Sequence, residues 1–99
     1  MIVTVFRSRL NEEHRDAYIA TAARMNELAV QMPGYISHKV FVAADGERCT
    51  IVEFEDDAGQ NTWAHNAEHV AAKKEGRKAY YSDYSLQICN VTRESKFPQ

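Results

Sequence analysis

The distribution of hydrophobic and polar residues along the chain predicts six elements of secondary structure. Residues 1–9 are rich in β-branched and aromatic side chains in both alternating phases, with Val3, Val5 and Arg7 against Ile2, Thr4 and Phe6, which is typical of a strand. Apolar residues then recur three, four and seven positions apart, which predicts an amphipathic helix of about five turns. We expect this helix to begin after Asn11, a common N-cap residue, and to end at Met32-Pro33-Gly34. Its apolar positions are Tyr18, Ala22, Met25, Leu28, Ala29 and Met32.

A hairpin, a second helical segment and a last strand follow. Residues 35–43 and 48–55 are typical of strands, and Asp45-Gly46 between them is a strong hairpin signal. Residues 57–84 hold the only Trp, and Asp57 and Gln60 match the spacing of a capping box. Residues 84–92 again predict a strand. The domain is expected to span residues 1–93, with a polar C-terminal tail over residues 94–99.

The order β-α-β-β-α-β predicts an α+β fold, a ferredoxin-like sandwich. Its antiparallel sheet would have the order 4-1-3-2, with both helices on one face. The first strand then separates the third from the fourth, so Cys49 and Cys89 would lie roughly 9–10 Å apart. A disulfide needs Cα atoms within about 7 Å. We therefore expect two free thiols.

The predicted strands are apolar on both faces, although the helices would cover only one. In residues 35–43, for example, Ile36, Val40 and Val42 fall in one phase, and Tyr35 and Phe41 in the other. A sheet with one solvated face shows cleaner alternation, and a large exposed apolar face usually marks an interface. The simplest cover is a second copy related by two-fold symmetry. The sequence thus predicts a homodimer through the sheet face, a dimeric α+β barrel.

Composition limits the classes of partner. A chain of 99 residues with a net charge of −2 makes one domain and shows no basic surface for nucleic acid or anionic membrane. No apolar run approaches the roughly 20 residues that span a bilayer, and no targeting signal is visible at the N-terminus. These features predict a soluble cytoplasmic protein that binds neither nucleic acid nor membrane. The sequence also contains no Gly-rich nucleotide loop, metal-ligand cluster or nucleophile motif.

Several motifs in order resemble the antibiotic biosynthesis monooxygenase domain family over residues 1–93. They are Met32-Pro33-Gly34-Tyr35, the hairpin, Trp63-Ala-His65-Asn-Ala-Glu68-His69, Gly76-Arg77 and the stretch from Tyr81 to Arg93. The resemblance implies the dimeric α+β barrel, in agreement with the pattern of the residues. For function it implies cofactor-free oxidation of polyketide phenols, oxidation of quinols, or heme degradation.

The heme-degrading relatives carry an Asn on the first strand, a Trp on the second helix and an axial His about ten residues after that Trp. Here Trp63 matches the pattern, but Lys73 stands ten residues later, and the first strand offers Phe6 and Arg7. Two of the three parts are missing, so heme degradation is the less favoured interpretation.

The residues of the second helical segment leave alternatives open. Trp63 is either a core residue or a wall against which a flat substrate stacks, and similar family enzymes have a cavity-lining Trp on this helix. His65 and His69 share a face, but a zinc site would need a third ligand. On a straight helix they point away from Trp63, whereas a break near Asn66 would turn His69 inward.

Other candidates lie on strands and near the end of the second helix. His38 is either a hydrogen-bonded core or interface residue or a general base. Arg7 is a rim or interface charge, or it holds an anionic substrate oxygen. Arg77 pairs with a carboxylate, caps a helix, or binds a substrate oxygen, and Tyr81 forms a wall.

The hypothesis that follows is a cofactor-independent monooxygenase. In such chemistry an electron-rich phenol or quinol is deprotonated and passes an electron to O₂, while the protein supplies orientation, a dry pocket and a base. The candidates for catalysis are His38 and Trp63, the candidates for substrate binding are Arg7, His69, Arg77 and Tyr81, and no metal or cofactor is assigned. The alternative is a non-catalytic dimeric module that binds a small apolar metabolite.

Overall fold

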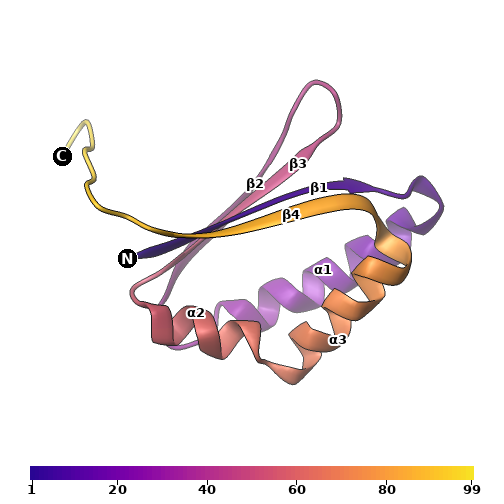
Figure 1. Cartoon of the computed structure of the whole chain (residues 1–99), viewed down its shortest axis with the longest axis horizontal. Helices are drawn as coiled ribbons and strands as arrows, with labels where there is room; N and C mark the ends of the chain where they lie inside the picture. The colour runs from indigo at the N-terminus through magenta and orange to yellow at the C-terminus, as the bar shows by residue number, and fades with distance from the viewer.

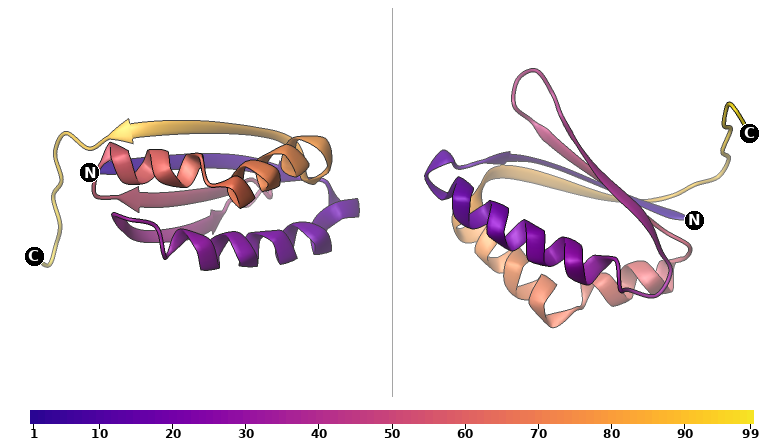
Figure 2. Two further views of the ribbon diagram at one scale, coloured as in Figure 1. Left: turned by 90° about the horizontal axis from the view of Figure 1, so that it is seen from below. Right: turned by 180° about the vertical axis from the view of Figure 1, so that it is seen from behind.

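The computed structural model describes all residues 1–99 and forms a four-stranded antiparallel sheet with its helices on one face (Figure 1 and Figure 2). The strand order is β2-β3-β1-β4, which confirms the predicted order seen from the other edge of the sheet. The elements are β1 (Ile2–Leu10), η1 (Glu12–His14), α1 (Arg15–Ala29), β2 (Tyr35–Val42), β3 (Arg48–Phe54), α2 (Asp57–Ala64), α3 (Ala67–Glu75), η2 (Gly76–Tyr80) and β4 (Tyr81–Asn90).

The central strand β1 fixes which side chains face the helices. Its residues Ile2, Thr4 and Ser8 are buried, whereas Arg7 between them is exposed. Directly opposed residues of an antiparallel pair share a sheet face, so β3 and β4 inherit this alternation from β1. Cys49 of β3 and Cys89 of β4 flank β1 on opposite sides and are free thiols, as predicted.

A β-bulge at the start of β2 changes the predicted phase of that strand. Tyr35 opposes Phe54, but the next partner of β3, Glu53, opposes Ser37, so Ile36 is an extra residue. Tyr35 and His38 therefore lie on the same, helix-covered face. A regular two-residue period predicts that His38 is in phase with Ile36 and so faces away from Tyr35. That prediction is wrong because a bulge inserts one residue into the period.

The first helix is shorter than predicted. A 3₁₀ turn precedes α1, and Asn11 does not cap it, because its side-chain amide donates instead to the carbonyl of Ala79 at 2.9 Å. The helix ends at Ala29, after 15 residues or about four turns, and Gly34 then reverses the chain with φ +77°. No helix of the structure has the length and apolar character needed to cross a membrane.

The residue that caps α2 is Asp56 rather than the predicted Asp57. The backbone of Asp56 is extended (φ −150°, ψ 173°), and its carboxylate accepts a hydrogen bond of 2.9 Å from the amide of Gly59. Both Asp56 and Asp57 have a side chain that can cap a helix. Only the extended backbone at Asp56 shows which of the two does so. Gln60 is buried instead of completing a capping box.

The core is small and lies under one half of the sheet. Only 10 of the 99 residues are buried, and the central cluster comprises Ile2, Ala29, Phe54 and Trp63. Elsewhere on the sheet Val42, Leu86 and Ile88 are at least half exposed. One chain alone therefore leaves much of its apolar sheet surface in contact with water.

Candidate functional site

The second helical segment breaks at Asn66, as one of the two predicted alternatives requires. The helix α2 ends at Ala64, and the Oδ1 atom of Asn66 accepts hydrogen bonds from the amides of Glu68 (3.0 Å) and His69 (3.1 Å) to start α3. Across the break, the ammonium group of Lys73 donates to the carbonyl of Ala64 at 2.8 Å. The chain changes direction between α2 and α3 (Figure 1). His69 is thereby brought against Trp63.

His69 lies flat against Trp63. The ring centroids are 4.0 Å apart with an interplanar angle of 11°, and Nδ1 of His69 lies 3.0 Å from the carbonyl oxygen of Trp63. A carbonyl oxygen only accepts, so Nδ1 carries the proton and Nε2 keeps a free lone pair in the neutral ring. Burial lowers the pKa of His69, and the positive charge of Lys73 lowers it further. The hydrogen bond to the carbonyl of Trp63 acts in the opposite direction but is smaller than the effect of burial. His69 is therefore a neutral hydrogen-bond acceptor near pH 7.

Trp63 belongs to the core. Its side chain is 9% exposed and shares the central cluster with Phe54, and His69 covers one face of the indole ring. A flat ligand cannot stack on a ring face that an imidazole already occupies. The exposed aromatic surface at this point therefore belongs to His69, and Trp63 holds that ring in place.

The bulge on β2 brings Tyr35 to His38. The hydroxyl of Tyr35 lies 2.5 Å from Nδ1 of His38, and the Tyr35 ring meets Phe54 edge to face at 6.3 Å. Phe54 in turn shares the core cluster with Trp63. A row of ring contacts thus runs from His38 to the Trp63–His69 pair. Three of the predicted site residues lie along this one layer between the sheet and the helices.

Tyr81 lies in a second aromatic group at the start of β4. Its ring centroid is 5.4 Å from Phe6, 5.6 Å from Tyr84 and 5.8 Å from Tyr18 of α1. Burial, followed by the influence of Tyr18, raises the pKa of Tyr81, so the phenol stays protonated and can donate a hydrogen bond. A Cβ atom on Gly76 would lie 2.6 Å from this ring, so the glycine makes room for it.

The predicted arginines lie apart from this layer. Arg7 is on the sheet face without helices and forms an ion pair of 2.8 Å with Glu47, its side chain 55% exposed. Arg77 is exposed in η2. The guanidinium group that reaches the aromatic residues is that of Arg48, whose Cζ lies 5.4 Å from the ring centroid of Tyr18. Sequence analysis missed Arg48, although its alternation with Val52 on β3 would have placed it on the helix-covered face.

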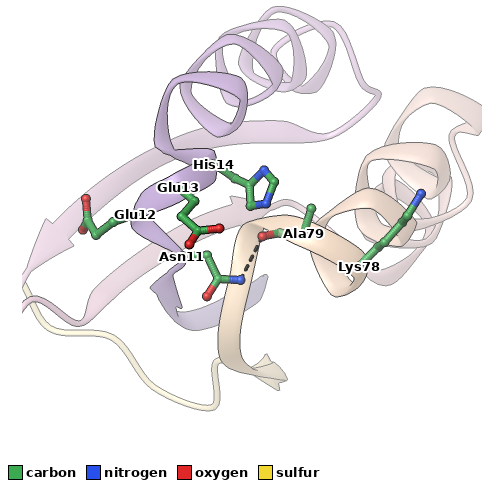
Figure 3. Close-up of a pocket in the computed structure, with 6 residues that line it drawn as sticks. All are labelled: Asn11, Glu12, Glu13, His14, Lys78 and Ala79. Atoms are coloured by element: carbon green, nitrogen blue, oxygen red, sulfur yellow. Dashed lines mark hydrogen bonds between the residues drawn. The ribbon is translucent and has the colours of Figure 1, made fainter.

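Two clefts open on the surface near the ends of these elements. One, of about 390 Å³, is polar and is lined by Asn11, Glu12, Glu13, His14, Lys78 and Ala79 (Figure 3). It contains none of the predicted site residues and no aromatic wall. The other, of about 470 Å³, is lined by Arg9, Leu10, Glu12, Arg15, Val42, Asp45, Gly46, Arg48 and Ser82. The second cleft is thus the one that adjoins the aromatic group, through Arg48.

Comparison with known proteins agrees with this architecture. The model of the antibiotic biosynthesis monooxygenase family matches residues 1–75. YqjZ of Bacillus subtilis strain 168, described as uncharacterized, is 33% identical over 95 residues, covering 96% of this chain and 83% of YqjZ.

Two solved structures have the same fold at low sequence identity. One is a putative antibiotic biosynthesis monooxygenase from Deinococcus radiodurans, with a TM-score of 0.85, 10% identity and full coverage of both chains. The other is a variant of SnoaB, a cofactor-independent oxygenase from Streptomyces nogalater, with a TM-score of 0.80 and 12% identity, covering 99% of this chain and 97% of SnoaB. At these identities the likeness concerns the fold alone.

Proposed function

Because the chain belongs to the antibiotic biosynthesis monooxygenase family, we propose that it is a cofactor-independent monooxygenase acting on a small phenol- or quinol-type metabolite. The observation that supports this most is the stacked Trp63–His69 pair, which holds a neutral imidazole with a free Nε2 lone pair in an aromatic layer. The structural likeness to SnoaB, described as a cofactor-independent oxygenase, is consistent with the same class of reaction.

In the proposed reaction the substrate supplies the electrons. A base removes a proton from an electron-rich aromatic substrate, the resulting carbanion passes an electron to O₂, and the two radicals combine. A ring CH₂ group and O₂ then give a carbonyl group and water. The protein orients the ring, excludes water and moves the proton.

Four of the six candidate residues have a defined part in this proposal. His38 is the base, and the hydrogen bond between its Nδ1 atom and the Tyr35 hydroxyl fixes the direction of its ring. His69 accepts a hydrogen bond from a substrate hydroxyl through Nε2, while Trp63 supports it from behind. Tyr81 contributes a protonated phenol as a wall and donor.

Replacing His38 with alanine is expected to slow oxygen consumption at least tenfold. The reason is that the variant lacks the base, and positioned bases typically contribute 10²–10⁴-fold. An oxygen electrode measures the rate with simple quinols and anthrone-type phenols. His14→Ala, at an exposed position in η1, is the matched control and should keep the wild-type rate.

Two outcomes would contradict this assignment. Unchanged turnover in the His38 variant, together with loss in His69→Ala, would make His69 the base instead. Stabilisation of the wild-type protein by these compounds without any oxygen uptake would favour the non-catalytic binding module. Circular dichroism of each variant separates loss of activity from loss of fold.

We also propose that the protein is a homodimer through the sheet face that the helices leave open. On this face Val5 opposes Ile51, and Phe41 is half exposed. A specific interface buries about 1,200–2,000 Å² in total, and a second copy of the sheet is an apolar surface of matching shape.

Sedimentation equilibrium is expected to give twice the 11.3 kDa mass of one chain at micromolar concentration. Phe41→Asp should raise the dissociation constant at least tenfold, because it places a carboxylate in an apolar contact. Phe97→Asp, in the fully exposed tail, is the control. A monomeric mass for the wild-type protein would contradict the proposal.

A further inference from the structure

Arg48 is a partly buried arginine that lacks an acceptor. Its Nε atom is buried without a hydrogen-bond partner. Four other arginines form ion pairs with carboxylates: Arg7 with Glu47, Arg9 with Asp45, Arg15 with Glu12, and Arg24 with Glu68. A buried donor without an acceptor is costly, and the cost is greater for a charged group. Arg9, Arg15 and Arg48 all line one cleft, and Arg48 is the one of the three whose charge has no carboxylate partner within the chain.

The cleft that contains Arg48 has the size of a small-molecule site. Its volume of about 470 Å³ lies within the usual range of roughly 300–1,000 Å³. It is lined by residues of the β2–β3 hairpin, the end of β1, the turn η1, the start of α1 and the start of β4. Residues from six elements and one turn thus converge on it.

The charges in the cleft favour an anion. Three guanidinium groups line it against two carboxylates. Arg9 and Asp45 neutralise each other at 2.8 Å, and Arg15 and Glu12 do so at 2.7 Å. The one excess positive charge therefore belongs to Arg48. A planar guanidinium matches the two oxygens of a carboxylate better than an ammonium group would.

The surroundings of Arg48 also favour a ligand with an apolar body. Its guanidinium packs over Tyr18, which meets Tyr81 edge to face at 5.8 Å. The positive charge is close enough to Tyr81 to oppose the effect of burial on the pKa of that phenol. Leu10 and Val42 add apolar surface to the cleft itself. Tyr18 and Tyr81 lie behind Arg48 and outside the lining of the cleft, so the apolar surface offered to a ligand is that of Leu10 and Val42. A ligand that matches these features carries an anionic group on a small apolar body, for which a flat ring is the simplest form.

We propose that this cleft binds a small aromatic carboxylate, with the ligand's carboxylate paired to Arg48. The site is distinct from the His38–Trp63–His69 layer. It concerns binding alone, so it holds whether or not the protein performs oxygen chemistry.

Isothermal titration calorimetry with 4-hydroxybenzoate and its neutral analogue 4-hydroxybenzamide tests the proposal. In the wild-type protein the acid is expected to bind at least tenfold more tightly than the amide, because the amide cannot form the ion pair. Arg48→Gln should weaken binding of the acid at least tenfold and abolish the preference. Arg93→Gln, which removes the same charge from an exposed position after β4, should leave both affinities unchanged.

Equal affinities for acid and amide in the wild-type protein would overturn the proposal. An equal loss in the Arg93 variant would also overturn it, because the preference would then reflect net charge. If Arg48→Gln does not fold, NMR titration of the wild-type protein with 4-hydroxybenzoate decides the question. The largest shifts are expected at the amides of Val42, Gly46, Arg48 and Ser82, and shifts centred elsewhere would place the ligand in another site.

Discussion

Replacing Phe54 with alanine is expected to lower the free energy of unfolding by about 3–5 kcal/mol. Phe54 is completely buried, opposes Ile2 of β1, and shares the core cluster with Trp63. The variant would lose the free energy gained by removing the ring from water, and it would leave a cavity where β3 meets α2. Since domains of this size have only about 5–15 kcal/mol of stability, this loss is a large part of the total. Urea denaturation followed by circular dichroism measures it.

The same substitution at Phe97 is the control for this experiment. Phe97 is fully exposed in the C-terminal segment, so Phe97→Ala should change the free energy of unfolding by less than about 0.5 kcal/mol. Phe54→Leu, which retains most of the apolar volume, should fall between the two. A loss below about 1 kcal/mol for Phe54→Ala would show that this cluster is not the centre of the core.

Gly59→Ala is expected to lower the free energy of unfolding by roughly 2–3 kcal/mol, although alanine is the better helix former. A Cβ atom at this position in α2 would overlap the carbonyl oxygen of Pro33 and touch Cδ1 of Phe54 at 3.4 Å. The carbonyl belongs to the backbone that leads into β2 and cannot rotate away as a side chain could. The helix would have to move off the sheet, and urea denaturation would detect the loss.

An exposed position on the same helix separates this clash from an effect on helix formation. Asn61→Ala introduces the same residue at an exposed position and removes only a surface hydrogen bond of 3.2 Å to Asp57, so its effect should stay within about 0.5 kcal/mol. Stabilisation by Gly59→Ala would mean that α2 does not lie against Pro33, and would remove the support on which the position of Trp63 depends.

The arrangement of the elements was predictable because it depends on local patterns. Alternation marks strands, the Asp45-Gly46 turn joins two of them, and the order of elements limits the topology. The bulge at Ile36 has no comparable signal, since only the pairing with β3 reveals the extra residue. Asn11 was misassigned for a similar reason, because the carbonyl to which it donates lies 68 residues away at Ala79.

The candidate site was predictable only in part. Asn66 offered a cap from its chemistry alone, and the consequence for His69 followed from helix geometry. Whether the helix breaks depends on whether other hydrogen bonds replace those of a continuous helix. One of these replacements is donated by Lys73 of α3 to the carbonyl of Ala64. The sequence could not predict that Arg7 pairs with Glu47 or that Nε of Arg48 has no hydrogen-bond partner. Both depend on tertiary structure, because the register of the β2–β3 hairpin against β1 sets them.

The middle position of β1 has a consequence for synthesis of the protein on the ribosome. One edge of this first strand pairs with β3, but the other must wait for β4, which ends at Asn90. Until those last residues emerge, the nascent chain displays an unpaired apolar strand edge, a template for pairing with other chains. The interval before β4 emerges is therefore when the polypeptide is most exposed to pairing with other chains.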